Sequence, residues 1–229
     1  DTTESRGLGD VYKRQELESP PKIIKNLFSK KELEKFLELY QKLPTTVHNK
    51  KQDVIKKRWL KNYSEELESL FSNKLESEIG DFKMDNLKDE NNEDILGLFQ
   101  ESYNPIGLHV DAGFNLDEII FKQTLIPLTS TGSTVIFKNK FYGNSTSFTI
   151  DENELKIKNL KYGQNIRSAE HLKIFNNEPF DKKNHEKYLK HEKIENLSGL
   201  EIDIVYEWEL GSILIFDRTR LHCSSSEID

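Results

Sequence analysis

Apolar side chains recur at spacings of three and four residues in the first part of the chain, the pattern of one face of an amphipathic helix. One such face follows the capping-box sequence Ser-Lys-Lys-Glu at 29–32 and ends before Pro44. A second begins after Ser64 and stops at Gly80, a residue common at helix C-termini. The apolar positions are Leu33, Phe36, Leu37 and Tyr40 in the first face and Leu67, Leu70, Phe71 and Leu75 in the second. We expect both helices to pack against the outside of a sheet.

The hydrophobic period changes at Ile95, where β-branched and aromatic residues begin to form short runs separated by turn residues. The predicted strands are 95–103, 106–110, 118–128, 133–138, 146–150, 155–160, 201–208 and 212–217. Many short strands with turn signals favour a sandwich or barrel. Residues 161–200 are polar and helix-prone, with the best helix at 181–193, and interrupt the strands like an insertion. Residues 45–62 are basic and polar around Trp59.

Composition narrows the class of protein. A chain of 229 residues with 35% hydrophobic content can form one domain with a sizeable core. Its net charge of -7 argues against a general nucleic-acid-binding protein, although it does not exclude a local basic groove. Cys223 is the one cysteine, so an internal disulfide is excluded. With no apolar run long enough to cross a bilayer and no leader-like start, we expect a cytoplasmic protein without a membrane partner.

Both ends of the sequence look atypical. Residues 5–15, SRGLGDVYKRQ, resemble the translation of a sequencing-library adapter, so we expect 1–18 to be a disordered or artefactual tail without function. The chain stops at 224–229 directly after a strand-like run and without a closing strand. We therefore expect the sequence to be a fragment that is truncated at its C-terminus.

The pair His109 and Asp111 lies in a predicted strand. Residues i and i+2 of a strand point to the same face, so the imidazole and the carboxylate can converge on one ion. With six His and 14 Asp in 229 residues, chance gives roughly 0.4 such pairs, so this motif is weak by itself. Without further support, a surface histidine beside a solvated turn carboxylate would be the better interpretation.

Specificity comes from the segment 211–224, GSILIFDRTRLHCS. A turn glycine opens a buried apolar strand, a polar bend follows, and His222 lies at the start of the next extended segment. Two histidines and one carboxylate on one face form the facial triad of non-haem Fe(II) oxygenases. Such a set leaves three adjacent coordination positions open for a bidentate co-substrate and for O₂, which four protein ligands would block.

These two motifs resemble the Fe(II)/2-oxoglutarate-dependent dioxygenase superfamily, nearest to its phytanoyl-hydroxylase-like and prolyl-hydroxylase-like members. The resemblance spans residues 100–226 and rests on H-x-D followed by G-S-x-x-x-F-D-R-T before the distal histidine. It implies a mainly β fold with flanking helices: a double-stranded β-helix (jelly roll, cupin-like) core over 94–229, with the insertion at about 161–200. Residues 19–93 resemble the helical support of that family, which makes 19–229 a single oxygenase domain.

The resemblance also implies a reaction. Fe(II) held by His109, Asp111 and His222 would act with 2-oxoglutarate as co-substrate and O₂ to hydroxylate a C–H bond, releasing succinate and CO₂. The family's usual cation for the far carboxylate of 2-oxoglutarate would lie beyond Asp229. The in-chain candidates for cofactor binding are Lys122 as a substitute cation, Thr124 and Tyr103 as hydrogen-bond donors, and Arg218 and Arg220 as contacts to substrate or co-substrate. The substrate, whether a small molecule or a side chain, and the oligomeric state are not indicated.

Other readings stay open. The chain could be a cupin-like barrel that binds a metal or ligand without oxygen chemistry, or a structural protein, such as a virion component, that keeps the fold without metal. We expect the remaining polar candidates to have ordinary roles: solvated histidines at His48, His171, His185 and His191, a turn-forming or ion-paired Asp217, and a packing thiol at Cys223. The lysines of 50–61 are typical of a solvated face, and the aromatic residues among them leave a weak nucleic-acid option.

Overall fold

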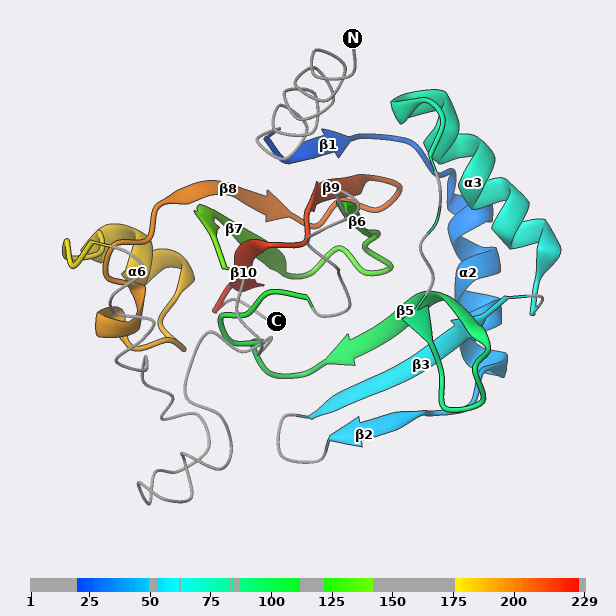
Figure 1. The fold of residues 1–229 in the computed structure, drawn as a ribbon, viewed down its shortest axis with the longest axis horizontal. Coiled ribbons are helices and arrows are strands. Elements are labelled where there is room, and N and C mark those ends of the chain that lie inside the picture. The colour runs from blue at the N-terminus through cyan, green and yellow to red at the C-terminus, as the bar shows by residue number, and fades with distance from the viewer. Residues whose placement is uncertain are drawn as a thin grey trace, which may run out of the picture. The chain divides into compact units, whose positions relative to one another are not determined.

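A computed structural model of the chain describes residues 20–49, 53–61, 63–82, 84, 87–111, 122–141 and 176–226 (Figure 1). Within these residues the fold is mainly β, with three antiparallel sheets and three α-helices. Contacts divide the chain into two compact units, one built from residues 1–24, 105–208 and 213–229 and the other from 25–104 and 209–212. The predicted tail at 1–18 and the predicted strands at 146–150 and 155–160 lie outside the described residues.

The unit that contains residues 25–104 holds the first predicted helix. Helix α2 spans Lys30–Lys42, and Ser29 and Glu32 form the predicted capping box. Its apolar face packs on the sheet of the same unit, because the Phe36 ring lies edge-on to that of Trp59 with centroids 5.9 Å apart. The prediction of an amphipathic helix packed against a sheet is therefore confirmed for α2.

The second predicted helix is also confirmed. Helix α3 spans Glu65–Ile79; Ser64 accepts a hydrogen bond from the Leu67 N–H at its start, and Gly80 ends it with a φ of 77°. Lys74 ties α3 to the preceding segments of this unit. Its ammonium group donates to the Leu27 carbonyl at 2.6 Å and pairs with Glu32 at 2.9 Å.

The sheet of this unit was only partly predicted. It has the order β2-β3-β5-β4, with β2 at Val47–Asn49, β3 at Val54–Leu60, β4 at Leu87–Lys88 and β5 at Asp94–Ser102. Strand β5 matches a predicted strand, whereas β2 and β3 lie in the segment read as basic and polar. The lysines of β3 hid the alternating pattern of a strand, because the aliphatic part of a lysine can pack in the protein while its ammonium group reaches a polar partner. The ammonium of Lys57, for example, donates to the Tyr40 carbonyl at 2.8 Å and lies 4.0 Å from the Tyr40 ring centroid.

The other unit contains two three-stranded antiparallel sheets. One has the order β1-β9-β6, with β1 at Lys22–Ile24, β6 at Lys122–Leu125 and β9 at Ile213–Asp217. The second has the order β10-β7-β8, with β7 at Ser133–Lys140, β8 at Ile202–Glu207 and β10 at Arg220–Ser224. The strands predicted at 118–128, 133–138, 201–208 and 212–217 are thus confirmed as β6, β7, β8 and β9, with shifted bounds.

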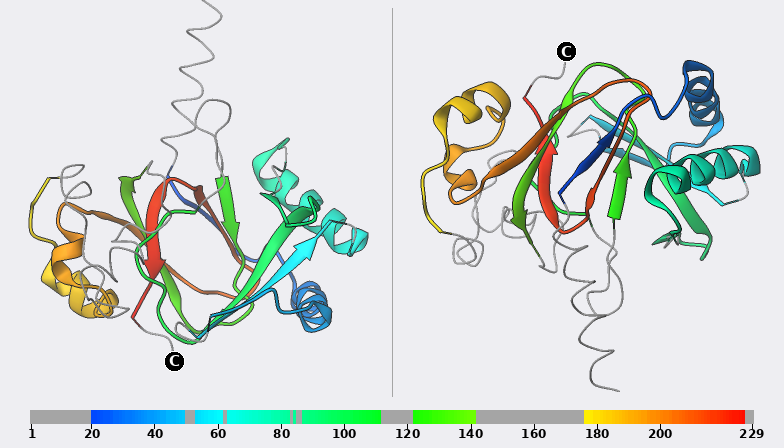
Figure 2. Two further views of the ribbon diagram at one scale, coloured as in Figure 1. Left: turned by 60° about the horizontal axis from the view of Figure 1, so that its bottom comes forward. Right: turned by 90° about the horizontal axis from the view of Figure 1, so that it is seen from above.

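Sheet β10-β7-β8 is covered on both faces (Figure 2). Toward sheet β1-β9-β6, Ile136 and Tyr206 pack against Leu214 and Phe216 in one core cluster. On the opposite face, the strands' other side chains form a second cluster with residues 180–200. That second layer carries helix α6 at Lys182–Tyr188 and a 3-10 helix, η1, at Ile194–Leu197. The part of the predicted insertion that the structure describes therefore covers a sheet.

Two predicted elements differ from the structure. The strand predicted at 106–110 is reduced to a single bridge between His109 and His222, because Pro105 and Gly107 interrupt a regular ladder. The helix predicted at 181–193 ends after Tyr188, where the chain turns so that Leu189 and Glu192 are both buried. In the described part of the chain, no helix has the length and apolar character needed to cross a bilayer.

Candidate metal centre

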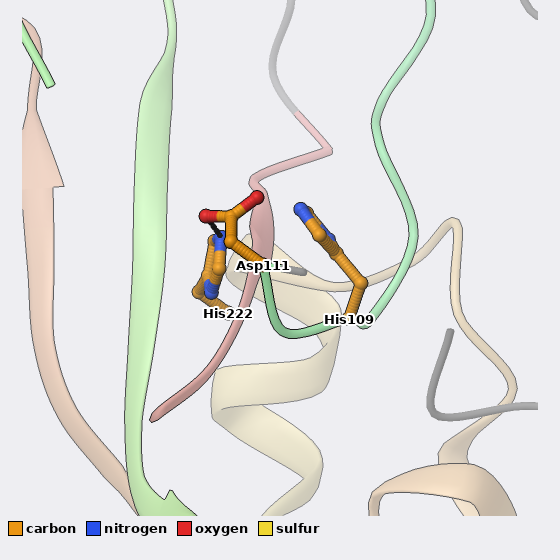
Figure 3. A group of neighbouring side chains, drawn as sticks. All are labelled: His109, Asp111 and His222. Carbon is orange, nitrogen blue, oxygen red and sulfur yellow. Dashed lines mark ion pairs between the residues drawn. The ribbon is translucent and has the colours of Figure 1, made fainter. Parts of the chain in front are cut away.

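Three side chains that are distant in sequence meet at one point of the two-sheet unit. The potential ligand atoms of His109, Asp111 and His222 all lie within 4.8 Å of one another, and the side chains extend toward the same space (Figure 3). The two imidazole centroids are 4.2 Å apart. Metal–ligand bonds of about 2 Å would not allow a shared ion if the rings were more than about 7 Å apart. The group therefore passes this geometric requirement.

The alternation of side chains along two paired segments produces this convergence. His109 and His222 form an antiparallel bridge, with backbone N–H to carbonyl distances of 3.0 Å and 2.9 Å. Their neighbours in sequence are buried in the core cluster on the helix-covered face: Leu108, Val110, Leu221 and Cys223. Since successive residues of an extended chain point to opposite faces, both histidines and Asp111 point to the other face.

Each imidazole is oriented by a backbone carbonyl two residues before it. Nδ1 of His109 lies 2.8 Å from the Gly107 carbonyl oxygen, and Nδ1 of His222 lies 3.0 Å from that of Arg220. A carbonyl oxygen only accepts, so each Nδ1 carries the hydrogen, and in the neutral ring Nε2 keeps its lone pair. This arrangement is typical of metal-ligating histidines.

The Asp111 carboxylate is held in its ionised form. An Asp111 oxygen lies 3.3 Å from Nε2 of His222, and the Gln123 side chain donates a hydrogen bond to the same carboxylate. Partial burial opposes ionisation, but the hydrogen bond and charge of His222 when its ring is protonated, the charge of a protonated His109 and the Gln123 bond outweigh it and hold the pKa of Asp111 well below its usual range. The Asp111 side chain is 40% exposed against 8% for His222, so solvent reaches the site from the Asp111 side.

Gln123 is a site residue that the sequence did not reveal. It lies on β6 opposite Phe216 of β9, whose ring is 5.0 Å from that of His222. Because Gln123 faces the ligand group, its neighbours Lys122 and Thr124 on the same strand face the opposite side and are exposed. The period of two correctly placed Lys122 and Thr124 on one face, but it did not indicate which face the site occupies.

The remaining cofactor-binding candidates are Tyr103, Arg220 and Arg218. Tyr103 belongs to the other unit, is 61% exposed and donates to Glu101 at 2.6 Å. Arg220 is buried and donates to Asp203 at 2.5 Å and to the Phe137 carbonyl at 3.2 Å. Arg218 is half-buried in the turn between β9 and β10.

Asp217 and Cys223 have the structural roles that the sequence predicted. Asp217 accepts hydrogen bonds from the Thr219 backbone N–H at 2.9 Å and hydroxyl at 2.8 Å, which forms the turn, and pairs with Lys140 at 3.1 Å. Its ion-pair partner is thus a lysine of β7. Cys223 packs in the core, and burial raises the pKa of its thiol.

The histidine predictions need correction at two positions. His191 is not a solvated residue: its Nδ1 lies 3.2 Å from the Ser226 hydroxyl oxygen, and burial lowers its pKa to about 4. His185 is half-buried and bonded through Nε2 to the Glu192 carbonyl at 2.9 Å. The polar composition around both residues hid their burial beside sheet β10-β7-β8. His48 is exposed as predicted, and His171 lies outside the described residues.

In comparisons with known proteins, no family model, no curated sequence and no solved structure matches this chain.

Proposed function

We propose that this chain is an Fe(II)- and 2-oxoglutarate-dependent dioxygenase that hydroxylates a C–H bond of its substrate. The observation that carries the proposal is the ligand group, in which two imidazole Nε2 atoms and one carboxylate meet while both Nδ1 atoms are engaged by carbonyls. Among the described residues this group has the composition of the facial triad, two histidines and one carboxylate. Three protein ligands leave coordination positions for a co-substrate.

Strand pairing supports a double-stranded β-helix for this unit. The His109 segment pairs with β10, β10 with β7 and β7 with β8, while β6 pairs with β9 in the opposing sheet. Along the described chain, the connections from β6 to β7, from β8 to β9 and from β9 to β10 cross between the two facing sheets, whereas β7 and β8 lie in the same sheet. Such crossing is typical of jelly rolls. In such a fold the ligand group would lie between the sheets, at the mouth of the barrel.

The chain's own residues prepare this site for a metal ion. In their neutral forms His109 and His222 present Nε2 lone pairs, and Asp111 supplies the negative charge that offsets a divalent cation. The Phe216 ring lies edge-on to His222 and shields that imidazole from water. When bound, Fe(II) would supply activation of O₂ together with 2-oxoglutarate.

A second candidate function is favoured by the position of Lys122. A co-substrate dicarboxylate needs a cation near the metal, and Lys122 faces away from the ligand group while Arg220 is paired with Asp203. Arg218 stays a candidate for that contact. If no cation serves it, the chain is a cupin-like barrel that binds a metal without oxygen chemistry.

Succinate formation tests the proposal. The full chain is loaded anaerobically with Fe(II), given 2-oxoglutarate and then O₂, and succinate and oxygen uptake are measured. We expect slow succinate release even without substrate, and none from His222→Ala. Tight metal binding without any succinate would leave the cupin-like function, and the absence of a tight metal site would reject both in favour of a structural role.

A further inference from the structure

The turn between α6 and η1 places a carboxylate in the protein interior. Glu192 is 7% exposed, and its Oε1 accepts a hydrogen bond from the Leu108 N–H at 2.7 Å. The Asn196 side chain also bonds to this carboxyl group. The backbone of Glu192 is anchored as well, because its N–H donates to the Leu189 carbonyl at 3.0 Å and its own carbonyl accepts from His185 at 2.9 Å. Glu192 is thus a fixed group and not a mobile side chain.

The peptide unit that Glu192 contacts is also the unit that orients His109. The carbonyl between Gly107 and Leu108 accepts the Nδ1 hydrogen of His109 at 2.8 Å, and the N–H of the same peptide donates to Glu192. A peptide unit is rigid and planar, so holding its N–H also fixes its carbonyl oxygen. A Cβ on Gly107 would lie 2.9 Å from Oε1 of Glu192, which shows how closely the carboxylate approaches.

This contact takes the place of a missing strand. The N–H and carbonyl of His109 bond to β10 on one side, so the Leu108 N–H points away from β10. In a regular sheet a further strand would accept that hydrogen, whereas here the Glu192 side chain accepts it. A buried polar N–H without a partner costs about 1–3 kcal/mol, so the segment depends on this acceptor.

We propose that Glu192 is a positioning residue for His109: its side chain holds the Gly107–Leu108 peptide, and that peptide turns the His109 ring so that Nε2 faces Asp111 and His222. The expected effect on metal binding rests on the proposed function, whereas the orientation of the His109 ring does not depend on a metal. It assigns a role to the α6–η1 segment, which braces the ligand segment from the far side of sheet β10-β7-β8.

Two readouts on the full chain test this role. Co²⁺ titration gives the metal affinity, and ring ¹⁵N NMR of the metal-free protein gives the tautomer of His109. The variants are Glu192→Ala, which removes the acceptor, and Glu192→Gln, whose amide oxygen can still accept from the Leu108 N–H. The matched control is Asn139→Ala, which removes two side-chain bonds to backbone atoms of this unit, to Gly199 and Glu201, without reaching a ligand.

We expect Glu192→Ala to weaken Co²⁺ binding by about 10- to 100-fold, the usual range for a residue that supports a metal ligand, and to mix the two tautomers of His109. Glu192→Gln should keep His109 in the tautomer with hydrogen on Nδ1 and retain most of the Co²⁺ affinity. Asn139→Ala should change neither the tautomer nor the affinity. An unchanged His109 spectrum in Glu192→Ala would overturn the proposal.

The NMR readout separates this inference from the proposed function. If the wild-type chain binds no Co²⁺ but Glu192→Ala still mixes the His109 tautomers, the metal site fails and the positioning role stands. If Glu192→Ala does not fold, Gly107→Ala replaces it, since the added methyl group displaces the same carboxylate. A normal His109 tautomer in Gly107→Ala would then overturn the proposal.

Discussion

The two proposed histidine ligands lie in segments that are held in different ways. His222 lies inside β10, which pairs with β7 over Arg220 to Ser224 and carries buried side chains at successive positions. His109 lies in a segment that is not a strand and meets β10 at one bridge. On the other edge of this segment, the Leu108 N–H is held by the side chain of Glu192, 84 residues beyond Leu108.

This difference shows two routes to an oriented imidazole. Strand β10 is held by the backbone hydrogen bonds of its ladder with β7, and the directions of its side chains follow from the alternation along an extended chain. The His109 segment is bonded to β10 at the bridge and through the Ser224 N–H to the Ile106 carbonyl, but it forms no continuous ladder, so its orientation depends more on long-range side-chain contacts. We therefore expect the His109 side of the site to be the more sensitive to changes outside the ligands, and the predictions below test this.

The largest effect is expected from removing either imidazole. His222→Ala and His109→Ala should each weaken Co²⁺ binding by more than about 100-fold, beyond the range for residues that only support a ligand. His222→Ala should also lower the free energy of unfolding by about 1–3 kcal/mol, since this buried ring packs on Phe216, and His109→Ala by less. Calorimetric titration and urea unfolding measure both, with exposed His48→Ala as control. Equal losses of unfolding free energy in His222→Ala and His109→Ala would contradict the difference between the two segments.

The next effect concerns pH. Burial holds the pKa of His191 at about 4, so between pH 6.5 and 4 the unfolded chain binds a proton that the folded chain does not. Stability should therefore fall as the pH falls through this window, by roughly 2 kcal/mol at pH 5 from His191 alone. His191→Asn keeps a donor near the Ser226 hydroxyl without titrating. Urea unfolding at pH 7 and pH 5 measures how much unfolding free energy is lost on acidification. This loss should be smaller in the variant by about the same amount, and an equal loss in both proteins would refute the assignment.

A third prediction uses two glycines. Gly107→Ala should displace the Glu192 carboxylate and weaken Co²⁺ binding by about 10-fold, because the new Cβ would lie 2.9 Å from Oε1. Gly97→Ala is the matched change in the other unit, where a Cβ would lie 3.3 Å from the Trp59 ring. It should affect stability alone. Titration of both variants checks this, and similar affinities would show that the His109 segment tolerates displacement of its support.

The smallest effect is expected on β6. Gln123→Leu removes a hydrogen bond to the Asp111 carboxylate and should weaken Co²⁺ binding by about 3- to 10-fold, the value of one such bond. Thr124→Val, the next residue on the opposite face, should leave the affinity unchanged. The reverse order of effects would show that Thr124, and with it Lys122, faces the ligand group.

Much of the fold could be predicted because its signals are local. The capping box at Ser29, the helix stop at Gly80 and the strands β5 to β9 depend only on neighbouring residues, and they appear in the structure within a few positions. Strand β3 was missed because its lysines imitate a solvated segment while their stems pack. The strand predicted at 106–110 exists as one bridge to β10, because Pro105 and Gly107 interrupt the ladder, and on its other edge the Glu192 side chain accepts the Leu108 N–H.

For the site, the sequence by itself determined the residue types and the spacing that let His109 and Asp111 share a face, since the period of an extended chain is a property of the backbone. Only the tertiary structure decided that His222 pairs with His109, that Gln123 and not Lys122 faces Asp111, and that Glu192 supports the ligand segment. These contacts join residues from different strands and turns. Their formation depends on how the sheets and the α6–η1 layer pack around a common core, which no local pattern encodes.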